Sequence, residues 1–366
     1  MRRPKVLFVG RTRYRLPLSS SLARKFDALG DELDLHVLAS AAERTSATDP
    51  VFTLVRPLRV RGLDGVAFWL ALPWRVTQLL RELRPEAVVC QTPYDAAATL
   101  LARRLSHVPA RVVVEVHGDW RTSTRLYGSP ARRLVSRFAD GLAALALRRA
   151  DAVRTVSPFT AGLVRALGVE PADDFPAYMD LEPFVREPQP LPHAPLVLFV
   201  GVLEAYKNVD GLADAWRRAA PRVPAATLHV VGKGTRTDVA DALVRLGARW
   251  DPELSPAEVA RALDEAWVLV LPSRSEGMGR VLVEAFCRGR GVVGTRAGSI
   301  PDLVQDGVSG LLVPPDDAGA LADALVRVLS DRSLAERLGE GARASAAPWL
   351  QSPEEYARRV RELVVA

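Results

Sequence analysis

Short apolar runs alternate with longer amphipathic stretches along the whole chain. The short runs predict buried strands, and the stretches in which apolar residues recur every three to four positions predict helices. Strands that alternate with helices are typical of a parallel sheet covered by helices. The expected strands are 5–10, 33–40, 87–92, 111–118 and 152–157 in the first half, and 195–201, 226–232, 267–273 and 291–295 in the second half.

The helical stretches carry start and stop signals, because Ser, Thr or Asp precedes many of them and Gly ends several. The pattern begins anew in the second half, which predicts two doubly wound α/β domains. The expected helices are 19–30, 95–105, 160–168, 209–220, 255–266, 279–289 and 317–330.

A proline-rich segment, EPFVREPQPLPHAP at 182–195, separates the two halves. Such a segment is neither a helix nor a central strand, so we interpret it as a linker. The tail reads as one more helix, capped by Ser352 and Pro353. The predicted organisation is an N-terminal domain at 1–183, a linker at 184–193, a C-terminal domain at 194–345 and a C-terminal helix at 346–366.

Composition narrows the class of protein. The 366 residues are 48% hydrophobic and 25% charged, as in a folded chain of two domains. The net charge of +6 suits phosphate-bearing ligands or anionic membranes, and an arginine-rich background explains it equally well. No basic stripe with interleaved aromatic residues points to nucleic acid.

The two cysteines and the N-terminal residues indicate the cellular compartment of the protein. Cys90 and Cys287 lie far apart without a CxxC motif, which argues against a zinc site or a disulfide framework. The apolar run near the N-terminus is too short for a signal peptide, and no run has the length of a membrane span. We therefore expect a cytoplasmic protein.

The loops after the strands of the second domain hold the candidate ligand-binding residues, because doubly wound domains bind ligands at that edge. Lys207 lies beside a helix start, where a cation and free N–H groups attract anions, although a solvated lysine is the commoner case. Gly201 ends the preceding strand, and Gly232 and Gly234 allow a ligand close to the backbone, although this Gly-x-Gly pattern alone is weak evidence. GRGVVG at 289–294 has the dinucleotide-binding spacing but follows a helix, so we reject it.

The most distinctive stretch is PSRSEGMGRVLVEAFCRG at 272–289. Glu276 lies in a glycine-rich loop, and Glu284 lies about two turns into the following helix. Carboxylates accept hydrogen bonds from sugar hydroxyls, and N–H groups at a helix start hold phosphate. On spacing alone, a turn glutamate and an ordinary helix glutamate remain the simpler interpretation.

The first domain offers fewer candidates. His117 follows a strand and either contacts a substrate or acts as an acid or base, although a lone histidine is more often structural. Arg11, Arg13 and Arg15 follow the first strand and are expected to form a basic loop that holds an anionic acceptor or lies on a solvated rim.

Together these segments resemble glycosyltransferase family 4, whose members are retaining enzymes of the GT-B fold. PSRSEGMGRVLVEAFCRG is similar to the E-x7-E signature of that family, and GTRAGSIPDLVQDGVSGLLVPPDD is similar to the segment that follows it. VRTVSPFTAGLV and FPAYMDLEPF resemble two earlier family segments. The resemblance implies two Rossmann-like domains that face each other across a cleft, with the C-terminal helix crossing back onto the first domain.

The resemblance also implies roles for individual residues. A nucleotide diphosphate sugar would be the donor, with no metal ion and no other cofactor. Glu284 would bind the ribose, Lys207 the diphosphate, and Glu276 the donor sugar, with His117 near the transferred sugar. The implied catalytic residues are His117 and Glu276. The further donor-side candidates are Gly201, Gly232, Gly234, Gly277, Met278, Gly279, Arg280 and Val281, and the acceptor-side candidates are Arg11, Arg13, Arg15 and Tyr94.

The chain departs from the family pattern in places. Val202 stands where the family has an arginine on the diphosphate, so Arg236 or Arg280 would have to replace that contact. Two alternatives to a transferase therefore stay open: a nucleotide-sugar-binding subunit with little activity, and a nucleotide-sugar epimerase of the same fold.

The acceptor is a hydroxyl compound of unknown identity, either lipid-linked or anionic in our expectation. GVAFWLALPWRVTQLLREL at 65–83 mixes aromatic residues with arginines. It is either a membrane-surface segment at the inner face of the membrane or a packed helix that is interrupted by a loop at Pro73.

Overall fold

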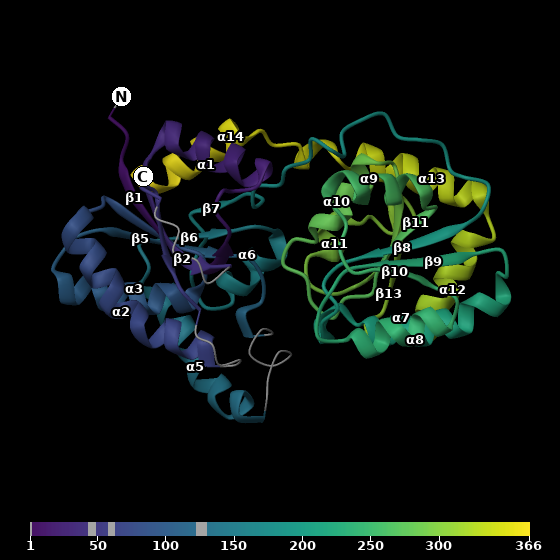
Figure 1. Cartoon of the computed structure of the whole chain (residues 1–366), viewed down its shortest axis with the longest axis horizontal. Helices are drawn as coiled ribbons and strands as arrows, with labels where there is room; N and C mark the ends of the chain where they lie inside the picture. Colours follow the sequence, from purple (N-terminus) through teal and green to yellow (C-terminus); the bar gives the residue numbers. More distant parts are fainter. Residues whose placement is uncertain (1, 43–48, 58–62, 122–129) are drawn as a thin grey trace. The chain divides into compact units, whose positions relative to one another are not determined.

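The computed structural model describes residues 2–42, 49–57, 63–121 and 130–366 (Figure 1). Side chains at 63–66 and 130–136 lie outside the described part. Contacts within the chain define two compact units. Unit 1 comprises Met1–Tyr178 and Gln351–Ala366, and unit 2 comprises Met179–Leu350.

Unit 1 is built on a seven-stranded sheet in the order β3-β2-β1-β4-β5-β6-β7, and the neighbouring strands are parallel. Nearly continuous apolar runs form the central strands because helices cover both faces of the sheet. The strands are β1 (Lys5–Tyr14), β2 (Asp34–Ala41), β3 (Phe52–Val55), β4 (Ala87–Cys90), β5 (Arg111–Val116), β6 (Ala152–Thr155) and β7 (Asp173–Asp174).

Two groups of helices enclose this sheet. On one face, α2, α3 and α5 bury Phe68, Ala102 and Leu147 against the strands. On the other face, α1 and α14 bury Leu29 and Tyr356. The helices of unit 1 are α1 (Ser20–Glu32), α2 (Leu63–Leu83), α3 (Pro93–Ser106), α5 (Pro130–Arg149), α6 (Pro158–Arg165) and α14 (Pro353–Val365).

Unit 2 has a six-stranded parallel sheet in the order β10-β9-β8-β11-β12-β13. Its strands are β8 (Leu196–Val200), β9 (Thr227–Val231), β10 (Arg249–Asp251), β11 (Val268–Leu271), β12 (Gly291–Thr295) and β13 (Gly310–Val313). Its helices are η1 (Ala205–Lys207), α7 (Val209–Ala219), η2 (Ala220–Arg222), α8 (Thr237–Arg245), α9 (Pro256–Glu265), α10 (Arg280–Cys287), α11 (Ile300–Leu303), α12 (Ala318–Leu329), α13 (Arg332–Ala344) and η3 (Ala347–Trp349).

The proline-rich segment belongs to unit 2, although the sequence was interpreted as a linker there. Arg288 donates hydrogen bonds to the carbonyl oxygens of Arg186 and Glu187, at 2.8 and 3.2 Å. Arg290 donates to the oxygen of Gln189, and Arg332 to that of Leu191. A segment that forms neither a helix nor a strand is thus fastened by arginine side chains, and the change of unit falls between Tyr178 and Met179.

The prediction for the end of the chain agrees with this division. Residues Gln351–Ala366 are part of unit 1, and Figure 1 shows α14 beside α1. Helix α14 starts with a capping box in which the Ser352 side chain accepts from Glu355 N–H, as the Ser-Pro pair indicated.

Several details of the prediction for unit 1 were wrong or incomplete, and helix α5 and the two-residue strand β7 were not predicted at all. Strand β1 continues to Tyr14 after a register shift, so Arg11 and Arg13 lie on a strand and not in a loop. Helix α2 runs through Pro73 without a loop. The short strand β3 was not predicted, because four residues carry too little periodic signal.

No helix in the described ranges is long and apolar enough to cross a membrane.

Candidate functional site

The strand order of unit 2 reverses at β8. The chain passes from β8 to β9 on one side and later to β11 on the other side. Ligands of doubly wound domains bind outside the carboxyl ends of the strands at such a reversal. The loops that follow β8 and β11 carry Lys207 and Glu276.

Lys207 and Glu276 form a buried ion pair at this position. The Lys207 Nζ lies 2.5 Å from the Glu276 Oε1, and each residue is only 8% exposed. The hydroxyl of Ser273 donates to the same Oε1 at 2.7 Å. The alternative of a solvated lysine in a turn is therefore wrong, and the Glu276 Oε2 remains without a hydrogen-bond partner among the described residues.

The backbone of Glu276 is held by the loop after β12. Gly298 has a φ of +57°, and a Cβ there would lie 2.2 Å from the Glu276 carbonyl oxygen. The N–H of Ser299 donates to that oxygen at 3.0 Å. The sequence did not single out Ser273 and Gly298 as supports of the site. Both lie within the segments that resemble the family, at 272–289 and 294–317, and that position was the available signal.

Arg274, another residue that the sequence did not single out, links the two loops. Its guanidinium donates to the Ala205 carbonyl oxygen at 2.6 Å and forms ion pairs with Asp210 and Asp316. The Arg274 N–H also donates to the Tyr206 oxygen at 2.7 Å. The turn that ends in Lys207 is thereby fixed against the loop that carries Glu276.

Helix α10 begins directly after this loop, at Arg280. Gly279 precedes it with a φ of +61°, and no side chain caps the helix N-terminus. Met278 and Val281 are buried on either side of that start. An uncapped helix start presents N–H groups and a partial positive charge, which suit an anion such as phosphate.

Glu284 lies in the second turn of α10 and is partly buried. No described residue donates a hydrogen bond to its carboxylate. Burial raises the pKa of Glu284, and the positive charge of Arg280 partly opposes that shift. A poorly solvated carboxylate with open acceptor positions would gain free energy from ligand hydroxyl groups.

The glycines after β8 and β9 allow the loops that follow these two strands to pack closely against each other. Gly232 has a φ of +144°, and a Cβ there would lie 1.9 Å from the Gly201 carbonyl oxygen. A Cβ on Gly234 would lie 2.3 Å from the Leu203 oxygen, whereas Gly201 itself has ordinary space. Loop packing therefore explains Gly232 and Gly234 without a ligand.

The basic residues near these loops are not equally available. Arg236 lies within ion-pair distance of Asp210 and Asp238, and Lys233 pairs with Glu253. Arg280 is exposed and has no ion pair with a described residue. Two arginines were considered as replacements for the contact that Val202 lacks. Of these, Arg280 is the one without an ion pair to a described residue.

In unit 1, His117 follows β5 at the carboxyl edge of the sheet. Its Nε2 lies 3.0 Å from the Glu115 Oε2, and its side chain is 41% exposed. Burial alone would raise the pKa of Glu115, but its ion pair with buried Arg154 and its contact with His117 hold that pKa well below the usual range. Glu115 is therefore ionised, and it orients an accessible imidazole.

The acceptor-side candidates lie on different elements. Arg11 and Arg13 are on β1, and Arg15 follows it. Tyr94, in the first turn of α3, donates to the Trp120 carbonyl oxygen at 3.2 Å and packs against Trp69 at 5.1 Å between ring centroids. Tyr94 is thus engaged in packing within unit 1.

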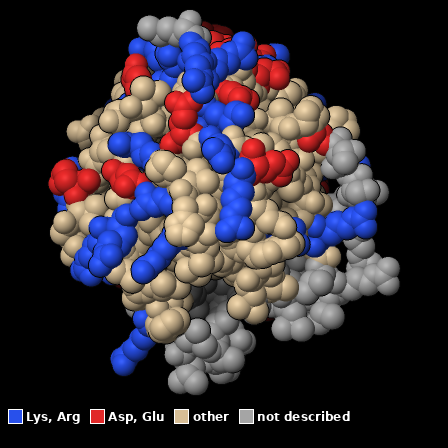
Figure 2. All heavy atoms as spheres, turned by 90° about the vertical axis from the view of Figure 1, so that its left-hand side faces the viewer, with Lys and Arg blue, Asp and Glu red and all other residues tan. Residues whose placement is uncertain are grey.

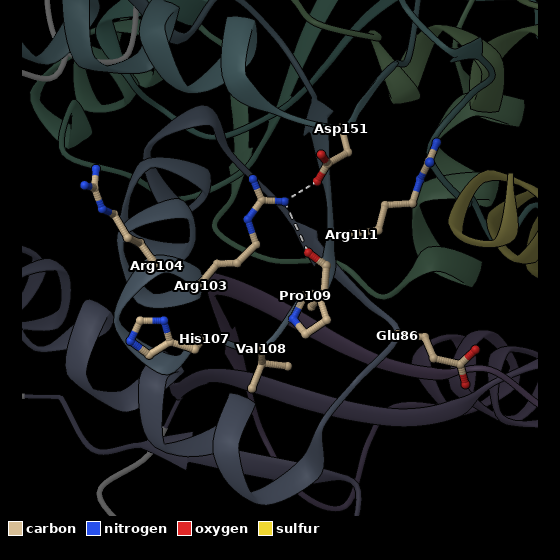
Figure 3. A pocket seen from close by; sticks show the side chains of 9 residues that line it. Glu86, Arg103, Arg104, His107, Val108, Pro109, Arg111 and Asp151 are labelled. Carbon is tan, nitrogen blue, oxygen red and sulfur yellow. Dashed lines mark hydrogen bonds and ion pairs between the residues drawn. The ribbon is translucent and has the colours of Figure 1, made fainter.

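A separate hollow lies at the opposite edge of the unit 1 sheet. On the side of the molecule shown in Figure 2, Lys and Arg side chains outnumber acidic ones. A hollow of about 810 Å³ is lined by residues that precede β4, β5 and β6, including Glu86 and Asp151. Figure 3 shows Arg103 directed at Asp151, with Arg104 and Arg111 pointing away from each other. The cations do not converge, so this hollow is not our candidate site.

Two doubly wound units, with the described features at the strand reversal of unit 2, define a protein of the GT-B class of folds. Two family models match the chain: "Glycosyl transferase 4-like domain" over residues 19–173 and "Glycosyl transferases group 1" over residues 194–331. The chain belongs to this glycosyl transferase family, as the sequence segments predicted.

Relatives and solved structures agree with this assignment. The D-inositol 3-phosphate glycosyltransferase of Frankia alni is 36% identical over 182 residues, which cover 45% of each chain. The chain spans less than half the length of the first curated relatives it matches. Sucrose-phosphate synthase from Thermosynechococcus elongatus has a TM-score of 0.78 at 18% identity, covering 99% of this chain and all of that one. Anabaena HepE in complex with UDP and glucose has a TM-score of 0.70 at 18% identity, covering 99% of this chain and all of that one.

Proposed function

We propose that this protein transfers a sugar from a nucleotide diphosphate sugar to a hydroxyl acceptor. The observation that supports it most directly is the position of Glu276 and Glu284 on either side of the uncapped start of α10. One site thereby offers carboxylate acceptors for sugar hydroxyls and N–H donors for phosphate. UDP is the first nucleotide to test, because HepE was solved with UDP.

In this proposal Glu284 and Glu276 act through carboxylate oxygens that no described residue hydrogen-bonds. Glu284 accepts hydrogen bonds from the ribose hydroxyls. The Glu276 Oε2 accepts one from the donor sugar, while its Oε1 keeps Lys207 in place. Lys207 and the first N–H groups of α10 stabilise the charge that develops on the diphosphate. Arg280 adds the guanidinium that Val202 does not supply.

We further propose retention of the anomeric configuration without a metal ion. The bond between the acceptor oxygen and the anomeric carbon forms on the face from which the diphosphate leaves. The acceptor proton passes to an oxygen of the leaving diphosphate. His117, oriented by Glu115, would contact the donor sugar.

The donor site is tested by thermal unfolding with UDP, GDP and ADP on three proteins. A ligand at one hundred times its Kd stabilises the native state by about 2.7 kcal/mol. We expect UDP to raise the Tm of the wild type and of Glu340→Gln, an exposed control on α13, but not that of Glu284→Gln. An equal shift in Glu284→Gln would remove Glu284 from the site.

Product analysis separates the remaining alternatives. Proton NMR of the product with a UDP-sugar and an accepted hydroxyl compound should show the anomeric configuration of the donor. Inverted product contradicts the retaining mechanism. Free epimerised sugar without an acceptor favours an epimerase, and UDP binding without turnover favours a binding subunit.

A further inference from the structure

Exposed apolar side chains gather on one helical face of unit 1. Of the thirteen large hydrophobic residues that are exposed within the described ranges, seven lie on α2, α3 and α5. These three helices lie side by side on one face of the sheet (Figure 1). A cluster of exposed large apolar side chains on neighbouring helices indicates an interaction site. The seven residues are Leu70, Trp74, Leu101, Leu105, Phe138, Leu142 and Leu145.

The spacing along α5 makes this face a regular feature. Phe138, Leu142 and Leu145 follow each other at helical intervals, so they share one side of the helix. They are 75%, 41% and 48% exposed, whereas Ala143 and Leu147 on the other side are buried in the core. The helix thus has an outer apolar stripe that the fold does not use.

A groove between α3 and α5 joins this stripe to positive charge. It has a volume of about 350 Å³, and Leu100, Leu142 and Leu145 contribute its apolar lining. Arg104 and Arg149 line it too, and neither has an ion pair or hydrogen bond with a described residue. No carboxylate lines the groove. The helix dipole favours cations near helix C-termini, which explains the positions of Arg104 and Arg149. It does not explain the apolar stripe.

We propose that the outer face of α2, α3 and α5 docks on an anionic phospholipid surface. The leucine and phenylalanine side chains enter the boundary of the acyl chains, and Arg104 and Arg149 meet the lipid phosphates. The charge favours this occupant over a second copy, because a symmetric contact would bring the arginines of the two copies together. The inference goes beyond the transferase proposal and does not depend on it.

Only some apolar residues of the segment at 65–83 are exposed and therefore available for contact with a membrane. Phe68 and Leu72 are buried in the unit 1 core, and Trp69 packs on Tyr94. Leu70 and Trp74 remain exposed, at 78% and 63%. Replacing Trp69 would disturb packing, so the test must use other positions.

The experiment is co-sedimentation with phosphatidylcholine vesicles, with and without phosphatidylglycerol, using the full chain and no donor. Leu145→Ser plus Arg149→Gln removes one apolar and one cationic contact. Val244→Ser plus Arg245→Gln is the matched control, since both residues are exposed on α8 of unit 2. We expect the partition coefficient on anionic vesicles to fall at least about tenfold in the first variant and to be unchanged in the control.

Several outcomes overturn the proposal. Wild-type protein that stays in the supernatant with anionic vesicles contradicts it. So does equal binding to vesicles without phosphatidylglycerol, or an equal loss in both variants. A wild-type dimer in light scattering that Leu145→Ser plus Arg149→Gln dissociates would assign the face to a second copy.

Discussion

The buried carboxyl group of Asp95 makes the stability of the protein depend on pH. It has no exposed surface, and its Oδ2 accepts from the Thr92 hydroxyl at 2.8 Å. Its Oδ1 is buried without a hydrogen-bond partner. Burial raises the pKa of Asp95 to about 7, although hydrogen bonds from Thr92 and the charge of Arg11 oppose the shift.

The sign of the resulting pH dependence follows from linkage. An unfolded aspartate has a pKa of about 3.9, so between roughly pH 4 and pH 7 the native state binds more protons at this group than the unfolded state. The contribution of Asp95 to the free energy of unfolding therefore falls as the pH rises through this window.

We predict that Asp95→Asn gains stability relative to the wild type as the pH rises. The difference in free energy of unfolding should grow by about 3 kcal/mol between pH 5 and pH 8, since one pKa unit corresponds to about 1.4 kcal/mol. Urea unfolding at both pH values measures this. Asp241→Asn, at an exposed position on α8, should show no such trend. A parallel pH dependence of Asp95→Asn and wild type would contradict the explanation.

At the scale of elements, the ends of β8 and β9 are joined through their loops. The Leu203 N–H donates to the Lys233 carbonyl oxygen, and the Arg236 N–H donates to that of Leu203, both at 3.0 Å. Trp250 donates its indole N–H to the Gly232 oxygen at 2.9 Å. The loop with Lys207 is thereby supported from the β9 side.

Gly232→Ala is expected to destabilise unit 2 strongly, because the new Cβ meets backbone 1.9 Å away at a positive φ. Backbone strain and overpacking together should cost about 3–5 kcal/mol. Gly247→Ala is the control, since its φ is also positive but its surroundings are open, and it should cost about 1 kcal/mol. Equal costs in chemical denaturation would show that the close contact relaxes.

These elements show what the sequence could and could not predict. Short apolar runs located β8, β9, β11 and β12, and therefore the edge at which Lys207 and Glu276 meet. The pairing of those two side chains depends on a single 3-10 turn and on Arg274. Neither produces a periodic signal. Likewise, periodicity identified apolar stripes but did not distinguish Phe68, which faces the core, from Leu70, which faces solvent.

At the scale of the molecule, unit 1 is completed by a segment distant in sequence. Tyr356 of α14 is 2% exposed and packs against Phe175 and Tyr178, at 6.0 and 5.8 Å between ring centroids. The same ring lies 5.5 Å from the Arg154 guanidinium, which holds Glu115 and, through it, His117.

Tyr356→Ala should therefore destabilise unit 1 by about 3–5 kcal/mol and leave unit 2 unchanged. Hydrogen exchange read by mass spectrometry reports the two units separately. Arg358→Ala, an exposed change on the same helix, should cost less than about 1 kcal/mol. Equal loss of protection in peptides from unit 2 would mean that the two units unfold together.

The division of the chain also determines the order in which the units can form during synthesis. All residues of unit 2, up to Leu350, are translated before the segment that supplies α14. The core of unit 1 therefore cannot close before residues 351–366 have been made, although most of its residues are translated first. Until that helix docks, the apolar face of α1 and the neighbouring strands is uncovered, so the two ends of the chain must meet before this core is complete.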